Sequence, residues 1–434
     1  MRFQHTLTRW LGALSLAAAT AALVAACGGG GDGGSNASVN TGTGGGDTSA
    51  GGGSNGGTGG TGGSGSTPLA SNQAAITVST GVATIINMPT VSVTICAPGT
   101  SACQTIGNVL VDTASYGLRI VNTAASGVLG SLPVSSVSGG TLTECGKFVT
   151  SYTWGTVRTA DVRIAGEQAS SLPIQIIGDL GSSGVPSSCS NGNAPSNTAA
   201  DLGANGILGI GPAPYDCGAN CTTSTLYSNY YACPNGNTSC QVTTVPLVQQ
   251  VANPVPRFAT DNNGVIVAMN PPAGGSATGT LTFGINTQSN NALPAGVTKL
   301  TSTTAGDLTG TLLGRAITTA FFDTGSNAYF FDTGGSTAVS LPVCSNNSSF
   351  YCPSSTQTTT ATVVGLNGAQ ASQSISIGNA SALFSSYKSA VPNLGGPFGN
   401  TRVLDFGLPH FFGKTLYFGM DLTGSGGAAP YVAF

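Results

Sequence analysis

Two short runs of one pattern constrain the fold of this chain more than any other feature. At positions 109–115 and 320–326, an apolar strand is followed by aspartate, threonine, a small residue and serine, so that Asp112 and Asp323 each end a buried run. Only 6% of the residues are charged, and an unpaired carboxylate in an apolar setting costs several kcal/mol. Two carboxylates in matching contexts therefore predict one shared site.

The first 27 residues have the features of an export signal. Arg2 and Arg9 give a positive start, positions 11–22 are apolar, and small residues precede Cys27. The apolar stretch is too short to span a membrane in a mature protein. Cys27 resembles the lipidated cysteine of a bacterial lipobox, and Gly28 after it favours the outer membrane. We expect export and lipid anchoring to the outer membrane, on its periplasmic or surface face; an ordinary secretory signal with a chance cysteine is the alternative.

A segment rich in Gly, Ser and Thr at 28–72 separates this signal from the rest of the chain. It has no apolar periodicity and cannot bury a core, so we expect a disordered tether. The remaining stretch of about 360 residues is too long for one core and suits two lobes. We expect an N-terminal lobe at 73–250 and a C-terminal lobe at 251–434.

The body of the chain has the sequence pattern of an all-β protein. Short β-branched runs are separated by clusters of Gly, Pro, Asn or Ser. These runs lie at 76–79, 82–86, 91–95, 160–164, 264–269 and 278–283. The strongest helix candidate is 245–251, with Pro246 at its start. Periodicity alone does not separate a sandwich, a propeller and a double barrel.

The cysteines indicate an oxidising compartment. Of the 11 cysteines, those other than Cys27 are even in number and several lie close together, which predicts disulfides. The close pairs are Cys96/Cys103, Cys217/Cys221, Cys233/Cys240 and Cys344/Cys352, with Cys145 and Cys189 left over. The four cysteines between 217 and 240 allow three pairings. A metal site is the competing interpretation, but no histidine lies near them.

Histidine and the basic residues disfavour several function classes. Beyond the signal the only histidine is His410, and no nucleophile motif accompanies it, which disfavours Ser-His-Asp and Cys-His chemistry. We expect His410 to pack at the end of a strand or helix. The chain has 12 Lys and Arg against 15 Asp and Glu, so no basic patch for nucleic acid can be drawn. The Gly-rich runs lack the context of a phosphate loop, and we expect neither a cofactor nor a metal.

Two carboxylates without histidine, metal or cofactor suit acid–base hydrolysis. Held close together, like charges cannot both ionise easily, so one pKa rises and the pair shares a proton. The ionised member can take a proton from an attacking water while the protonated member supports the developing oxyanion. Glycoside hydrolysis also uses two carboxylates, but it does not require matched Asp-Thr-small-Ser loops. The symmetry favours peptide hydrolysis.

These features resemble a pepsin-like aspartic protease over nearly all of 80–434. In that family each lobe has an Asp-Thr-Gly-Ser/Thr loop, and a later apolar-apolar-Gly segment passes beside it. Positions 205–211 resemble that segment in the first lobe, and 403–407 resemble it in the second. The resemblance implies an all-β, bilobal double barrel with an inter-lobe cleft and few short helices. The nearby run at 332–335 has Asp-Thr-Gly but lacks the serine, and we expect a turn there.

The resemblance also implies roles for individual residues. Asp112 and Asp323 would be the catalytic dyad, two threonines would interlock the loops, and two serines would hydrogen-bond the outer carboxylate oxygens. These supporting residues, with the glycine of the second loop, are Thr113, Thr324, Ser115, Ser326 and Gly325. The family also closes a β-hairpin flap bearing an aromatic residue over the substrate. Its counterpart is 149–157, where the spacing fits either Tyr152 or Trp154, followed by Gly155.

Two residues near Asp112, Ala114 and Arg119, could disturb the two aspartates. Ala114 stands where the family has glycine; alanine is tolerated if its backbone dihedrals are ordinary, and otherwise strain of about 1–3 kcal/mol would displace Asp112. Arg119 lies seven positions after Asp112. If it folded back towards the dyad it would lower a carboxylate pKa; we expect a surface or lobe-lining charge instead.

The sequence therefore predicts an aspartic-type endopeptidase that hydrolyses peptide bonds with a water activated by Asp112 and Asp323. The expected partners are a peptide or protein substrate and the membrane through Cys27, with no nucleic acid, and we expect a monomer. The alternative is a pepsin-shaped surface or binding lipoprotein with weak or no activity. A third possibility is another all-β surface protein, such as an adhesin or carbohydrate binder, without a dyad.

Overall fold

The computed structural model describes residues 68–79, 81–148 and 151–434. The predicted signal peptide at 1–27, the lipidation site Cys27 and positions 28–67 of the predicted tether lie outside the described residues. Asn72, the last position of the expected tether, is buried, and its side-chain amide donates to Phe283 O at 3.0 Å. The packed body therefore begins slightly before position 73.

Two sheets of strands build the body of the protein. The larger, 17-stranded sheet consists of β1 (Gln73–Val78), β2 (Pro89–Cys96), β3 (Cys103–Asp112), β4 (Tyr116–Val121), β5 (Ser136–Val137), β6 (Gly140–Lys147), β7 (Ser151–Ile164), β8 (Glu167–Ile177), β9 (Ala194–Pro195), β10 (Gly206–Ile210), β11 (Tyr230–Cys233), β12 (Gln241–Val242), β13 (Gly264–Met269), β14 (Ala277–Phe283), β15 (Lys299–Thr301), β23 (Thr415–Gly419) and β24 (Tyr431–Ala433). The smaller, 7-stranded sheet consists of β16 (Leu308–Leu312), β17 (Arg315–Phe322), β18 (Tyr329–Phe331), β19 (Gln357–Val364), β20 (Gln370–Ile377), β21 (Gly395–Gly396) and β22 (Val403–Phe406).

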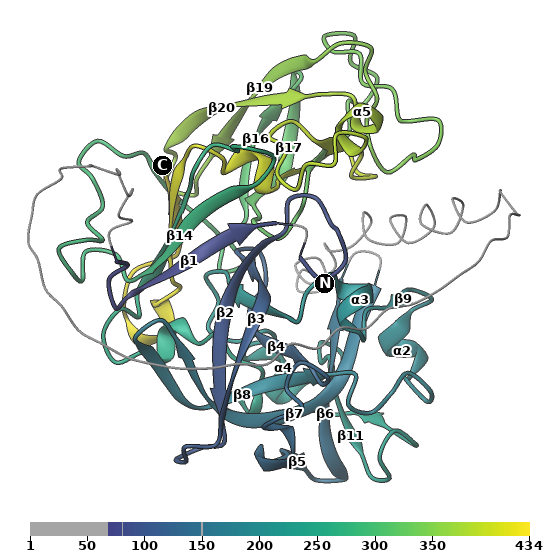
Figure 1. The fold of residues 1–434 in the computed structure, drawn as a ribbon, viewed down its shortest axis with the longest axis vertical. Coiled ribbons are helices and arrows are strands. Elements are labelled where there is room, and N and C mark those ends of the chain that lie inside the picture. The colour runs from purple at the N-terminus through teal and green to yellow at the C-terminus, as the bar shows by residue number, and fades with distance from the viewer. Residues whose placement is uncertain (1–67, 80, 149–150) are drawn as a thin grey trace, which may run out of the picture.

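The strands form two lobes joined by a shared layer. Figure 1 shows β16, β17, β19 and β20 at one end of the molecule, β2 to β8 at the other, and β1 with β14 between them. In that layer β1 pairs with β14, β14 with β13, β13 with β23, β23 with β24 and β24 with β15, all antiparallel. One buried apolar cluster runs through both lobes and this layer, so the two ends pack as one body.

The helices are short. The α-helices are α2 (Ser187–Ser190), α3 (Ala199–Leu202), α4 (Asn220–Thr223) and α5 (Ala380–Phe384), and the 3-10 turns are η1 (Leu129–Ser131), η2 (Leu247–Gln249), η3 (Val255–Arg257), η4 (Leu408–His410) and η5 (Thr423–Ser425). The predicted all-β, bilobal fold class with few short helices is confirmed.

Most predicted strands form, and one does not. Strands cover 91–95, 160–164, 264–269 and 278–283, and β1 covers most of 76–79. The strand expected at 82–86 is wrong, because that segment forms turns in which Thr84 has a φ of 57°. Its Ile85 packs into a small side cluster with Leu110 and Ile207, so an apolar β-branched run serves a buried turn here. The helix expected at 245–251 is reduced to η2, which begins after Pro246.

Five disulfides link the ten cysteines outside the signal. Cys96–Cys103, Cys217–Cys221, Cys233–Cys240 and Cys344–Cys352 join the close pairs, and Cys145–Cys189 joins the two that were left over. The predicted disulfides are confirmed, and of the three ways to pair the four cysteines between 217 and 240 the structure has the one with two local disulfides. Four of the five close short loops, whereas Cys145–Cys189 ties β6 to α2 across 44 positions.

Within the described ranges, no helix is long and apolar enough to cross a membrane. Those same residues contain no group of three or more His, Cys, Asp or Glu side chains arranged to hold a metal ion.

Candidate functional site

Two matching strand arrangements place the two aspartates. Asp112 is the last residue of β3, and β10 runs parallel to β3 with Gly209 opposite Asp112. Asp323 follows β17 directly, and β22 runs parallel to β17 and ends one residue before Gly407. A Cβ on either glycine would collide with the backbone of the adjoining loop. The two apolar-apolar-Gly segments therefore pack beside the two aspartate loops because glycine allows the close approach.

Thr113 and Thr324 interlock the two loops. The Thr113 hydroxyl donates to Phe322 O at 2.8 Å, and the Thr324 hydroxyl donates to Val111 O at 2.7 Å. Each hydroxyl also accepts the other threonine's backbone N–H, at 3.0 Å and 3.2 Å. The loops, 211 positions apart, are thus held by four buried hydrogen bonds with approximate two-fold symmetry. The predicted contact between the loops is present.

The carboxylate of Asp112 is fully buried and accepts hydrogen bonds from its own loop. Its Oδ1 accepts the backbone N–H of Ala114 at 2.8 Å and of Ser115 at 3.1 Å, and its Oδ2 accepts the Ser115 hydroxyl. Ala114 has no positive φ. Alanine therefore fits at this position without backbone strain, and its amide still donates to the carboxylate.

Asp323 has a similar set of donors and one additional neighbour. Its Oδ1 accepts the backbone N–H of Gly325 at 2.9 Å, and the Ser326 hydroxyl oxygen lies 3.0 Å from its Oδ2. The same hydroxyl oxygen lies 2.6 Å from Oδ2 of Asp405. Both Asp323 and Asp405 are fully buried, so a third carboxyl group stands one hydroxyl away from the pair.

Burial and mutual repulsion shift the titration of the pair. The pKa of Asp112 is raised well above its ordinary value, first by burial and then by the charge of Asp323, with a further rise from the hydrogen bond between the two side chains. The amides of Ala114 and Ser115 oppose this shift, but they do not reverse it. Two carboxyls so close titrate as a unit, and they retain one shared proton into the range in which isolated aspartates ionise.

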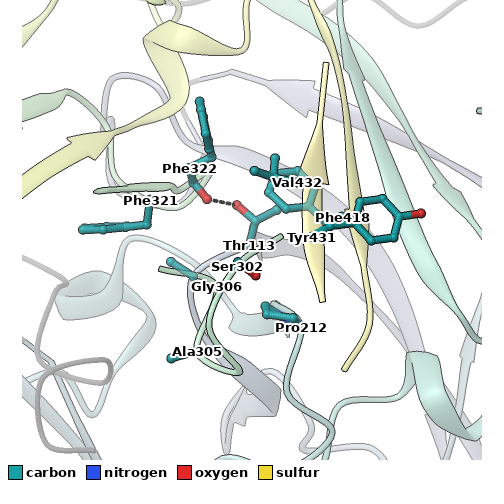
Figure 2. A pocket seen from close by; sticks show the side chains of 11 residues that line it. Thr113, Pro212, Ser302, Ala305, Gly306, Phe321, Phe322, Phe418, Tyr431 and Val432 are labelled. Atoms are coloured by element: carbon teal, nitrogen blue, oxygen red, sulfur yellow. Dashed lines mark hydrogen bonds between the residues drawn. The ribbon is translucent and has the colours of Figure 1, made fainter. Parts of the chain in front are cut away.

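A small cavity lies behind the first loop. Figure 2 shows it between Thr113, whose hydroxyl donates to Phe322 O, the loop that carries Ser302 and Gly306, and the strand that carries Val432. Its volume of about 20 Å³ has room for about one water molecule. It is too small for a substrate side chain.

The flap candidates lie on the predicted hairpin, but both aromatics are buried. Trp154 has no exposed surface, its indole N–H donates to Asn237 at 2.7 Å, and its ring packs edge-on against Tyr231. Tyr152 is 5% exposed and belongs to the same cluster. A Cβ on Gly155 would collide with the β8 backbone, so this glycine allows β7 and β8 to pair closely.

Arg119 lies in a position that the sequence did not indicate. The expected surface or lobe-lining charge is wrong, because Arg119 is fully buried and forms ion pairs with Glu144 and, at 3.4 Å, with Asp216. Asp216 also accepts the Tyr230 hydroxyl at 2.5 Å and the Asn229 amide at 3.0 Å. Arg119 therefore satisfies carboxylates of the first lobe and does not fold back onto Asp112.

One cation against two buried carboxylates leaves this cluster short of positive charge. The pKa of Glu144 is raised well above its ordinary value by burial, which outweighs the lowering by Arg119, and Asp216 raises it further. Glu144 lies on β6, which pairs with β7, and Arg119 lies on β4, so the cluster ties the strand beside the flap candidates to the strand that follows the first aspartate loop.

His410 packs beneath the second loop. It is buried, its ring lies 5.2 Å from Phe322 and 4.8 Å from Phe406, and Lys414 Nζ lies 3.1 Å from its Nε2. Burial and the Lys414 charge lower the pKa of His410 well below its ordinary value. His410 ends the 3-10 turn η4, in agreement with the expectation that it packs at the end of a strand or helix.

Sequence reasoning missed four polar residues of these buried networks: Glu144, Asp216, Tyr230 and Asp405. A signal was available for Asp405, which lies between Leu404 and Phe406 in an apolar run of a chain with only 15 acidic residues. A carboxylate in such a run is normally paired or functional.

Comparisons with known proteins give a family and distant structural neighbours. The model of a family described as protein of unknown function (DUF3443) matches residues 68–434. No curated protein matches the chain. Among solved structures, the aspartic proteinase from Irpex lacteus is similar, with 15% sequence identity and a TM-score of 0.46; the match covers 83% of this chain and 96% of that one.

Proposed function

We propose that this chain, which belongs to the family described as protein of unknown function (DUF3443), is an aspartic-type endopeptidase. Asp112 and Asp323 activate a water that hydrolyses a peptide bond of a peptide or protein substrate. The single observation that carries the proposal is the pair of fully buried aspartates, one from each half of the chain, whose loops are interlocked by Thr113 and Thr324.

The chemistry follows from the shared proton. In the monoprotonated pair, the ionised carboxylate takes a proton from the attacking water, and the protonated carboxyl donates a hydrogen bond to the carbonyl oxygen on which negative charge develops. The threonine interlock fixes the separation of the two carboxyls, because each loop is bonded to the residue before the other loop's aspartate. Such positioning matters because general acid–base catalysis requires both groups within hydrogen-bond reach of the reacting atoms.

The acidic pH range is part of the proposal. The pair must carry one proton, and the raised pKa of Asp112 keeps that proton in place at pH values where free aspartate has lost it. Activity therefore falls when the pair loses its last proton as the pH rises. It also falls at very low pH, when both carboxyls are protonated and no base is left.

Peptide cleavage tests the proposal. The purified full chain is incubated with a mixed peptide library from pH 3 to pH 7, with and without a statine-type inhibitor, and products are identified by mass spectrometry. We expect inhibitor-sensitive cleavage at acidic pH that is absent in Asp323→Ala. Equal cleavage by the wild type and Asp323→Ala would end the protease proposal.

Asp332 offers a matched control within the same chain. It begins a second Asp-Thr-Gly run, directly after β18, in a segment that ends in a turn. Asp332→Ala removes an aspartate from the same short motif without touching the pair. We expect Asp332→Ala to cleave peptides as the wild type does. Loss of cleavage in Asp323→Ala is then due to the aspartate pair and not to the removal of any Asp-Thr-Gly aspartate.

The alternative function is a pepsin-shaped surface or binding lipoprotein with weak or no activity. The burial of both flap aromatics favours it, because Tyr152 and Trp154 pack among disulfides and Tyr231 instead of standing over the carboxylates. In that case the wild type and Asp323→Ala would both be inert towards peptides, and peptides would still bind.

For its location, we propose that the chain is exported and anchored to the bacterial outer membrane through a lipid on Cys27, acting as a monomer. The charged start, apolar stretch and small residues before Cys27 support export, and the five disulfides suit an oxidising compartment. Metabolic labelling with a fatty-acid probe tests it: label should enter the wild type and not Cys27→Ala.

A further inference from the structure

Asp405 has no counterpart in the first half of the molecule. It lies on β22 opposite Phe321, two residues before Asp323, whereas the matching position on β10 is Ile207, opposite Leu110. Ile207 packs into an apolar cluster, and Asp405 has no exposed surface. The approximate two-fold symmetry of the site is therefore broken by a carboxyl group at a position that elsewhere holds an isoleucine.

The contacts of Ser326 require a proton on one of its two carboxyl neighbours. Its hydroxyl oxygen lies 3.0 Å from Asp323 Oδ2 and 2.6 Å from Asp405 Oδ2, both within hydrogen-bond range. A serine hydroxyl has one hydrogen and can donate to only one of them. If both carboxyls were ionised, the second contact would place an oxygen lone pair against a carboxylate in a water-poor interior.

The surroundings of Asp405 favour the neutral acid. Its register partners on β17 and β18 are Phe321 and Phe330, and full burial disfavours the charged form. The titratable groups on the elements packed against this strand are Asp323, reached through Ser326, Arg315 at the opposite end of β17, and Tyr329 and His410, which both pack on Phe406. Burial raises the pKa of Tyr329 and lowers that of His410, so burial favours the neutral form of each.

Resting on the proposed peptidase function, we propose that Asp405 is a positioning residue of the site. Its carboxyl keeps its proton and donates to the Ser326 hydroxyl oxygen, so that the Ser326 hydrogen stays directed at Asp323 Oδ2. Ser115 makes the corresponding donation to Asp112 Oδ2 in the first half without a third carboxyl. Each of Asp112 and Asp323 then accepts a hydroxyl hydrogen bond on its outer oxygen. The proton that the pair shares stays between the carboxyl oxygens that face each other.

The protonation state can be measured without any enzymatic activity. Infrared spectra of the full chain in detergent are recorded at pH 5 to 7 for the wild type and Asp405→Asn. We expect the difference spectrum to lose the carbonyl band of a protonated carboxylic acid. Loss of a carboxylate band instead would overturn the proposal, whether or not the protein proves to be a peptidase.

Two substitutions separate positioning from packing in the peptidase assay. Asp405→Asn keeps a donor near Ser326, and we expect kcat within about threefold of the wild type and an unchanged pH profile. Asp405→Ile copies the first half of the molecule and cannot donate; we expect kcat to fall about tenfold with KM unchanged, the effect of about one hydrogen bond. If Asp405 only filled space, Asp405→Ile would be more active than Asp405→Asn, because isoleucine suits an apolar interior better than asparagine.

Either of two results would overturn the positioning role. One is an Asp405→Ile variant that is as active as the wild type, and the other is an Asp405→Asn variant that is as impaired as Asp405→Ile. Thermal unfolding of both variants is measured alongside, since a loss of activity counts only in a folded chain. A wild type without peptidase activity would contradict the proposed function, and the infrared result would still decide whether Asp405 holds its proton.

Discussion

Thr113 and Thr324 each bond the residue that precedes the other loop's aspartate, through Phe322 O at 2.8 Å and Val111 O at 2.7 Å. Each hydroxyl also accepts the other threonine's backbone N–H. A threonine hydroxyl that donates once and accepts once uses its bonding capacity well in a buried setting. This reciprocal arrangement is what makes one site out of two loops that lie 211 positions apart in the sequence.

Removing one hydroxyl should destabilise the protein. Thr324→Ala loses its donation to Val111 O and leaves the Thr113 backbone N–H without its buried acceptor, so we expect a loss of about 2–4 kcal/mol in the free energy of unfolding. Thr324→Ser keeps the hydroxyl and should lose less than about 1 kcal/mol. Chemical denaturation measures both; equal losses in the two variants would contradict the hydrogen-bond account.

Ala114 should be neutral for the site. Because its φ is not positive, Ala114→Gly relieves no strain, and it adds flexibility to the unfolded chain, which costs about 0.4–1 kcal/mol. We expect peptidase activity within about threefold of the wild type, since the amide that donates to Asp112 remains. A tenfold or greater gain in activity with glycine would show that the methyl group holds the first loop out of position.

The buried cluster around Arg119 should respond unequally to its two simplest changes. Arg119→Met leaves Glu144 and Asp216 buried without their cation, and we expect a loss of about 3–5 kcal/mol in unfolding free energy. Glu144→Gln leaves one cation with one carboxylate, and we expect a loss below about 1.5 kcal/mol. Chemical denaturation decides; a larger loss in Glu144→Gln would mean that Glu144 is the essential anion.

Asp112 and Glu144 should contribute less to stability as the pH rises. The pKa values of Asp112 and Glu144 are raised in the folded state above the ordinary values of 3.8 and 4.5, so above these values the unfolded chain releases protons that the folded chain keeps. Their contribution to stability is therefore complete below the ordinary values and is lost as the pH rises towards the folded values. Denaturation from pH 4 to pH 8 is compared with the double variant Asp112→Asn/Glu144→Gln, because His410, whose pKa is lowered, adds stability in both proteins as the pH rises. The stability of the wild type relative to the double variant should fall over that range, and a rise in this difference would contradict the assigned shifts.

The repeated loop pattern and the resemblance it carries anticipated the fold class, the meeting of Asp112 with Asp323 and the interlocked threonines, because each depends on a short local motif. The sequence could not anticipate Arg119 in a buried ion cluster or the contact of Asp405 with Ser326. Those contacts join side chains 25, 79 and 97 positions apart, and no local pattern encodes them. The strand prediction for 82–86 was wrong for a related reason. Apolar β-branched residues suit both a strand and a buried turn, and tertiary packing decides between them.

The claim that Asp112 and Asp323 form one peptidase site has a direct test in three matched variants. Cleavage of the mixed peptide library at pH 3 to 7 is compared for the wild type, Asp112→Asn, Asp323→Asn and Asp332→Asn, with folding checked by thermal unfolding. We predict inhibitor-sensitive cleavage by the wild type and Asp332→Asn, and a loss of at least about a thousandfold in each of the other two. Cleavage that survives in folded Asp112→Asn or Asp323→Asn, or a folded wild type that cleaves nothing across this range, would contradict the account.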